Sequence, residues 1–248
     1  MKLRVGFIGI KGGVGKTTLA LNTAFYLSNK KYKVLYIDKD FLSMGSLILG
    51  FNGKGFHKAI TDDLGKEEYE YKVNDNLTIF KFYSDPVNEE ILQERAKTKS
   101  DKLIKAYLDV ISKGYDVIIV DYGRIFKTND PLVYTEFDLF RKHFHDYLIG
   151  GVGITNALIE DVIKDVRYYI DLRMRINFKP LAFVINMVPQ IGDIQREINE
   201  EIKKIRDILN CEVVTIPFKQ EFLQYNNLGR HEDLIQVGKI IERYINQT

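Results

Sequence analysis

Short apolar runs alternate along the chain with longer stretches in which apolar residues recur at helical spacing. The short runs are typical of buried strands, because few polar residues interrupt them. They predict strands at 4–9, 33–38, 77–82, 116–121, 146–152, 181–186 and 212–216. The longer stretches predict helices at 17–29, 86–96, 101–113, 135–144, 155–175, 192–209 and 232–246.

The clearest helical pattern is at 192–209. Its apolar residues form one stripe at spacings of three and four: Ile194, Ile198, Ile202, Ile205 and Leu209. Almost wholly apolar strands separated by helices indicate a mainly parallel, twisted sheet with helices on both faces. We therefore expect a single α/β domain over residues 1–248, in which the loop-rich segments 39–76 and 121–135 follow strand ends, where ligands bind.

The composition is typical of a folded protein in a reducing compartment. Of the 248 residues, 28% are charged, and 36 Lys and Arg against 34 Asp and Glu leave a formal net charge of +2. This balance excludes a protein that coats nucleic acid by overall charge alone, but it leaves a local basic patch open. Since Cys211 is the one cysteine, an intramolecular disulfide and a cysteine metal site within the chain are excluded. No apolar run approaches the length of a membrane-spanning helix, so the sequence predicts a cytoplasmic protein.

A glycine-rich segment between the first predicted strand and helix carries the clearest chemistry. Residues 9–18 read Gly-Ile-Lys-Gly-Gly-Val-Gly-Lys-Thr-Thr. Glycines let the backbone curl so that its N–H groups point inward, and together with the positive end of a helix they can hold a polyphosphate. The residues expected to bind nucleotide here are Gly12, Gly13, Val14, Gly15, Lys16, Thr17 and Thr18. Lys16 is expected to reach the β- and γ-phosphates, and the Thr17 hydroxyl to bind Mg²⁺.

This loop departs from the general phosphate-loop pattern, because Ile10 stands where that pattern has its first glycine. It matches instead the deviant form with a second lysine, Lys11. Here the sequence resembles the ParA/MinD family of deviant Walker A ATPases. The resemblance implies ATP and Mg²⁺ as cofactors, slow hydrolysis to ADP and phosphate, and a homodimer in the ATP state. It also implies that Lys11 contacts the phosphates of the facing subunit, since no role within its own subunit is evident; a solvent-exposed lysine is the alternative.

Two acidic strand ends extend the resemblance. Asp38-Lys-Asp40 resembles the first switch of the family, in which Asp40 matches the carboxylate that positions or activates the attacking water. Asp38 would organise the surroundings of Mg²⁺, and the alternative for both is a pair of loop acids that cap a turn. Asp121, at the end of a strand, resembles the Walker B aspartate that holds Mg²⁺ through water. The following run lacks the proline of the family and brings Gly123 early, so the residue that senses the γ-phosphate stays open.

Base recognition is expected at two further strand ends. Asn186 resembles the adenine-contacting asparagine of the family, and its amide can both donate and accept hydrogen bonds. Pro217 resembles the segment that lines the adenine slot. From the residues alone, an Asx turn is the alternative for Asn186, and a strand terminator is the alternative for Pro217. The catalytic residues implied are Lys11, Lys16 and Asp40, and the metal ligands implied are Thr17, Asp38 and Asp121.

Several functions remain open for such an ATPase. The favoured one is ParA-like DNA segregation, in which the ATP dimer binds DNA nonspecifically and a ParB-like partner protein stimulates release. The most basic stretch that could contribute contains Arg95, Lys97, Lys99, Lys102 and Lys105. The alternatives are a MinD-like positioning ATPase on a membrane or a protein scaffold, and a nucleotide-gated regulator with little hydrolysis. A membrane anchor is disfavoured, because the apolar stripe at 232–246 is flanked by charges of both signs.

Overall fold

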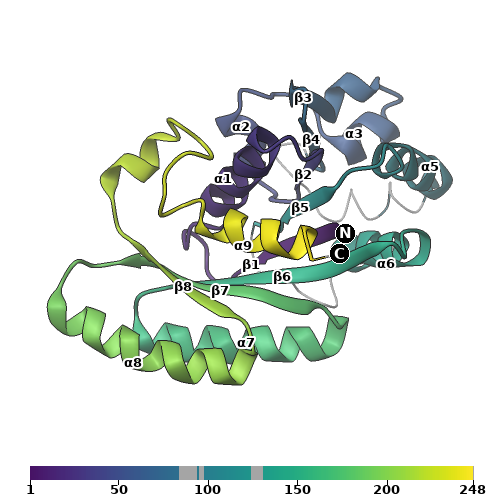
Figure 1. Ribbon diagram of the computed structural model, residues 1–248. Helices are drawn as coiled ribbons and strands as arrows, with labels where there is room; N and C mark the ends of the chain where they lie inside the picture. Colours follow the sequence, from purple (N-terminus) through teal and green to yellow (C-terminus); the bar gives the residue numbers. More distant parts are fainter. Residues whose placement is uncertain (84–93, 95–97, 124–130, 248) are drawn as a thin grey trace.

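A computed structural model of the chain describes residues 1–83, 94, 98–123 and 131–247. Within them, one eight-stranded sheet has the order β3-β4-β2-β5-β1-β6-β7-β8 (Figure 1). The strands are β1 (Lys2–Ile8), β2 (Val34–Asp38), β3 (Glu70–Asn74), β4 (Leu77–Lys81), β5 (Val117–Asp121), β6 (Tyr147–Asn156), β7 (Lys179–Val188) and β8 (Glu212–Pro217). These described strands pair in parallel, except that β3 is antiparallel to β4. The expected α/β fold with a mainly parallel sheet is confirmed.

Helices cover both faces of the sheet. They are α1 (Lys16–Asn29), α2 (Met44–Ile48), α3 (Phe56–Thr61), α5 (Ser100–Ile111), α6 (Pro131–His143), α7 (Ile159–Ile176), α8 (Gly192–Leu209) and α9 (Gln236–Ile245), with short 3-10 turns η1 (Lys66–Glu68) and η2 (Gln220–Gln224). Helices α1 and α9 pack on one face, whereas α3, α5, α6, α7 and α8 pack on the other (Figure 1).

The two faces bury separate apolar clusters, as the alternation of side chains along a strand requires. In β2, Leu35 and Ile37 face α5, while Val34 and Tyr36 face α1. Both sets are fully buried, and this accounts for the continuous apolar runs in the sequence. At the end of a central strand, therefore, one residue points to the α1 face of the sheet and the next residue points to the α5 face.

The predicted strands are all present, and α8 has the predicted bounds. The segment 39–76 was expected to be mainly loop, but it contains α2, α3 and β3. The sequence signal for β3 is weak, because this edge strand is mostly exposed and rich in charge, and it forms by pairing with β4. The predicted helix 86–96 and the basic residues Arg95 and Lys97 lie outside the described residues, apart from position 94.

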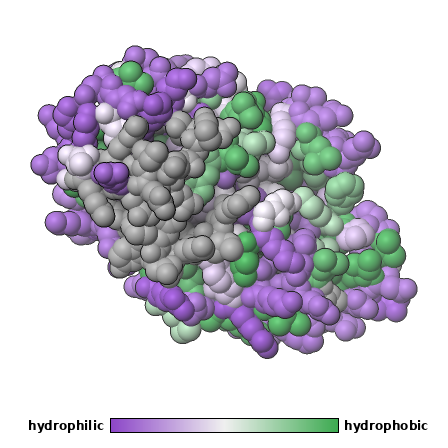
Figure 2. All heavy atoms as spheres, turned by 180° about the vertical axis from the view of Figure 1, so that it is seen from behind, coloured by the Kyte–Doolittle hydropathy of each residue, from purple (hydrophilic) through white to green (hydrophobic). Residues whose placement is uncertain are grey.

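The surface carries isolated apolar residues among polar ones. Figure 2 shows this mixture on the face opposite to that of Figure 1, outside the grey atoms. Exposed apolar side chains such as Met174 and Ile208 lie on different helices, α7 and α8. Scattered exposure of this kind is ordinary for folded proteins. Among the described helices, none combines the length and apolar character needed to cross a membrane.

Candidate nucleotide-binding site

The glycine-rich loop joins the end of β1 to the start of α1, as its sequence predicted. Gly13 and Gly15 have φ values of 76° and 93°, a left-handed conformation that glycine adopts without strain. Lys16 is buried, and its Nζ donates a hydrogen bond to the backbone oxygen of Lys11 over 2.8 Å. No described side chain caps the N-terminus of α1, so its first N–H groups remain available to an anion.

A pocket beside this loop brings the two predicted adenine contacts together. Asn186 and Pro217 line it with Gly15 and Thr18 of the loop and with the exposed ring of Phe218. Asn186 Nδ2 donates to the backbone oxygen of Val14 over 2.8 Å. A Cβ atom at Gly15 would lie 2.3 Å from that nitrogen, so glycine is also required here by close approach.

Sequence reasoning missed Tyr225, which contacts the pocket residue Thr18. The hydroxyl groups of Tyr225 and Thr18 lie 3.2 Å apart in a hydrogen bond. Tyr225 follows η2 with a φ of 51°, far along the chain from the phosphate loop, and no local pattern marks it. Its contact fixes the hydroxyl of a predicted nucleotide-binding residue.

The three predicted acids gather at the ends of β2 and β5, because the parallel register aligns Asp38 with Asp121. Burial raises the pKa of Asp38 to about 7, and the charge of Asp121 adds to the effect. Burial also raises the pKa of Asp121, against hydrogen bonds from Thr17, Gly123 and Tyr36. Burial lowers the pKa of Lys16, while the charges of Asp121 and Asp40 oppose that change. The loop lysine and these carboxylates therefore interact within one buried site.

The donor set fits a magnesium ion that keeps water and phosphate ligands. The Thr17 hydroxyl bonds to Asp121, so two predicted ligands lie together. Across the described ranges, no group of three His, Cys, Asp or Glu residues is placed to hold a metal ion. Mg²⁺ is commonly bound by one or two protein oxygens together with substrate phosphates and water, so this set suits it.

Asp38 is occupied by contacts within the protein. Its Oδ2 accepts hydrogen bonds from the backbone N–H and the hydroxyl of Ser46, both over 2.7 Å. Its Oδ1 accepts a bond from the backbone N–H of Asp40 over 3.3 Å. Asp38 thereby anchors α2 to the end of β2, and its role near Mg²⁺ stays a prediction.

Gly123, the early glycine after Asp121, lies against two of the predicted acids. It has a φ of 63°, and its backbone N–H donates to Asp121 Oδ1 over 3.2 Å. A Cβ atom at this position would lie 2.4 Å from Asp40 Oδ1. The early glycine therefore lets the segment after β5 approach the predicted water-positioning carboxylate directly.

Lys11 has a partner within its own subunit, contrary to the expectation from the sequence. Its ammonium group forms an ion pair with Asp161 in the first turn of α7, although about half of the Lys11 side chain is exposed. The hydrogen bond from Lys11 is the main cause that lowers the pKa of Asp161. No sequence motif marks Asp161, because it meets Lys11 only in the folded protein.

The candidate basic stretch is partly neutralised. Lys99 and Lys102 each form an ion pair with Asp63 over 2.8 Å. Both lysines lie at the start of α5, and Asp63 follows α3. Their positive charge is therefore less available to a polyanion than the sequence suggested.

Known proteins resemble the chain in sequence and in fold. An uncharacterized protein of Methanocaldococcus jannaschii is 27% identical over 208 residues, which cover 79% of this chain and 77% of that protein. The septum site-determining protein MinD of Pyrococcus horikoshii, solved with Mg-ADP, has a TM-score of 0.70 at 19% identity, over 98% of this chain and 97% of that one. A plasmid partition protein of Borrelia burgdorferi, solved with AMPPNP, has a TM-score of 0.67 at 19% identity, over 100% and 99% of the two chains. Residues 5–230 match the CobQ/CobB/MinD/ParA nucleotide-binding domain, and the chain belongs to that family.

Proposed function

We propose that this chain is an ATP-dependent dimerising ATPase of the ParA type. The observation that carries the proposal is the contrast between its two loop lysines. Lys16 is buried beside the carboxylates, where it can reach the phosphates of its own nucleotide. Lys11 is half exposed at the outer lip of the loop and can exchange Asp161 for the phosphates of a facing subunit.

The site suits the electrostatic demands of phosphoryl transfer. Lys16 offsets negative charge on the transferred group, and the loop N–H groups hold the phosphates in place. Bound Mg²⁺ would supply further charge neutralisation, with Thr17 and Asp121 as its protein ligands. Asp40 keeps a small exposed fraction of 8%, so its carboxylate can orient a water molecule and hold the proton that the water loses.

The surface on which the dimer acts has two candidates. We favour nonspecific DNA, with release stimulated by a ParB-like partner protein, and the similarity to a plasmid partition protein supports this reading. The second candidate is a positioning role on a protein scaffold or a membrane. It is supported by the pairing of Lys99 and Lys102 with Asp63 and by the similarity to MinD.

Light scattering with a nonhydrolysable ATP analogue tests the dimer. The wild type should shift from monomer to dimer, while Lys11→Ala should bind the analogue and stay monomeric. Lys204→Ala is the matched control, because Lys204 is also exposed and ion-paired, with Glu201. A wild type that stays monomeric, or a Lys11→Ala protein that dimerises normally, would refute dimerisation through contact of Lys11 with the phosphates of the facing subunit.

DNA co-sedimentation with ATP and with ADP, at two salt concentrations, separates the two surfaces. ATP-dependent binding that weakens steeply with salt supports the DNA role, because phosphate contacts release counterions. Dimerisation without DNA affinity supports the positioning role instead.

A further inference from the structure

One buried carboxylate lies on the other face of the sheet from the nucleotide-site acids. Glu136 of α6 accepts two hydrogen bonds from the guanidinium of Arg4, each over 2.8 Å. Lys39 Nζ donates to Glu136 Oε2 over 3.1 Å, and the hydroxyl of Tyr107 donates to Oε1. The side chains of Arg4, Lys39 and Glu136 are at most 5% exposed.

This arrangement is unusual, because two cations share one carboxylate away from water. Burial alone would raise the pKa of Glu136, but the charges of Arg4 and Lys39 hold it at about 2. The group therefore stays charged under ordinary conditions. Well-packed apolar residues often stabilise a protein as well as a buried ion pair does. A contribution to stability alone therefore does not explain why these charged residues are buried together.

Lys39 connects the network to the first switch. It stands between Asp38 and Asp40. Its backbone N–H donates to the backbone oxygen of Asp121 over 2.9 Å, so the pairing of β2 with β5 continues by one residue. Since neighbouring residues of an extended chain point to opposite faces, a Lys39 side chain held on the α6 face directs Asp40 to the α1 face. The ammonium group also lies 4.9 Å from the ring centre of Phe82, which encloses it.

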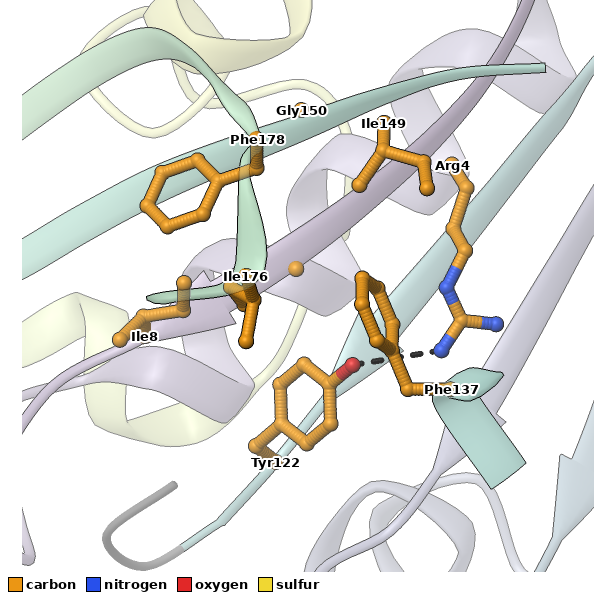
Figure 3. A pocket seen from close by; sticks show the side chains of 9 residues that line it. Arg4, Ile8, Tyr122, Phe137, Ile149, Gly150, Ile176 and Phe178 are labelled. Atoms are coloured by element: carbon orange, nitrogen blue, oxygen red, sulfur yellow. Dashed lines mark hydrogen bonds between the residues drawn. The ribbon is translucent and has the colours of Figure 1, made fainter. Parts of the chain in front are cut away.

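Tyr122 connects the network in the same way to Asp121 and the run that follows it, which we call the second switch. It follows Asp121, and its hydroxyl accepts a hydrogen bond from Arg4 over 3.2 Å (Figure 3). The ring lies against Gly6 of β1, where an added Cβ atom would lie 2.9 Å from it. Each switch therefore has one residue whose side chain lies on the α6 face and contacts Glu136, either directly or through Arg4.

We propose that Glu136 is a positioning residue, which sets the two switch acids Asp40 and Asp121 by holding Lys39 and Tyr122 behind them. This proposal rests on the proposed ATPase function for its effect on turnover. A displacement of α6 would move Asp40 and Asp121 together. Lys39, beside Asp40, and Arg4, which bonds to Tyr122 beside Asp121, share the Glu136 carboxylate.

Lys39→Met is the informative variant, because it keeps most of the length of the side chain, removes its charge and leaves the Arg4–Glu136 bonds in place. We expect the kcat of ATP hydrolysis to fall about tenfold with an unchanged KM for ATP, and Lys39→Arg to recover most of the loss. Tyr107→Phe is the matched control. It removes one bond to the same carboxylate but leaves the bonds from Arg4 and Lys39 in place, so its kcat should stay within twofold of the wild type.

Amide hydrogen exchange supplies a readout that needs no nucleotide. In Lys39→Met, the N–H groups of residues 39, 40 and 123 should exchange at least tenfold faster, while those within β1 and β5 stay unchanged. Uniformly faster exchange would indicate a merely structural role and would overturn the proposal.

With an active wild type, the kinetic and exchange changes together support the proposal, and either change alone overturns it. If the wild type does not hydrolyse ATP, the proposed function fails. The exchange pattern then decides by itself whether Glu136 positions the switch segments, so the two failures are distinguishable.

Discussion

The glycine-rich loop and the predicted switch segments lie at the same edge of the sheet, but they are held in different ways. The loop takes much of its shape from its own backbone, through glycine conformations and the bond from Lys16 to Lys11, although Asn186 of β7 also donates to Val14. The switch residues depend on side chains from other elements, such as Ser46 for Asp38 and Glu136 for Lys39. A locally determined loop tolerates change elsewhere in the protein, whereas a switch held from outside can respond to it.

The largest expected effect is on the loop itself. Lys16→Ala should lower ATP affinity at least about 100-fold, because it removes charge-assisted bonds to two phosphates, each typically about 1.5–3 kcal/mol. Calorimetric titration measures the affinity, with Lys204→Ala as the control. Affinity equal to that of the wild type would refute the phosphate-loop assignment.

The next effect separates chemistry from binding. Asp40→Ala should retain ATP binding and lose about 100-fold in turnover, since a positioned general base commonly contributes that much or more. Turnover and calorimetry on the same preparation check both halves. Hydrolysis at the wild-type rate would show that another acid, with Asp121 the first to consider, orients the water.

A smaller effect is expected where the two switches touch. Gly123→Ala should lower turnover about tenfold and leave ATP binding intact, because its Cβ atom would displace Asp40. Gly114→Ala is a close control: Gly114 has a φ of 73° against 63° for Gly123, but no atom lies within 4 Å of its added Cβ. Both variants carry a backbone strain of about 1 kcal/mol, visible in thermal unfolding. Equal turnover in the two would mean that the contact with Asp40 is unimportant.

The same contrast explains what the sequence could predict. The loop is recognisable because its glycines and lysines are adjacent in the chain, and the acids are recognisable because they end apolar strands. Glu136 could not be found in this way, since its bond to Arg4 joins residues 132 positions apart. Arg4 itself interrupts an apolar strand, and only the fold shows what neutralises it. The edge strand β3 was missed for a related reason, because pairing with β4 rather than its own apolar pattern forms it.

The smallest expected effect concerns Lys11, a loop residue whose side chain is held by another element, as the predicted switch residues are. If Asp161 retains Lys11 in the monomer, Asp161→Asn should strengthen analogue-induced dimerisation. A partly exposed ion pair contributes at most about 1 kcal/mol, so we expect a gain of about threefold. Glu201→Gln makes the same change of charge at the surface pair with Lys204 and should have no effect. Analytical ultracentrifugation across a range of protein concentrations resolves such a shift. Weaker dimerisation in Asp161→Asn would reverse the interpretation, because Asp161 would then orient Lys11 toward the facing subunit rather than withhold it.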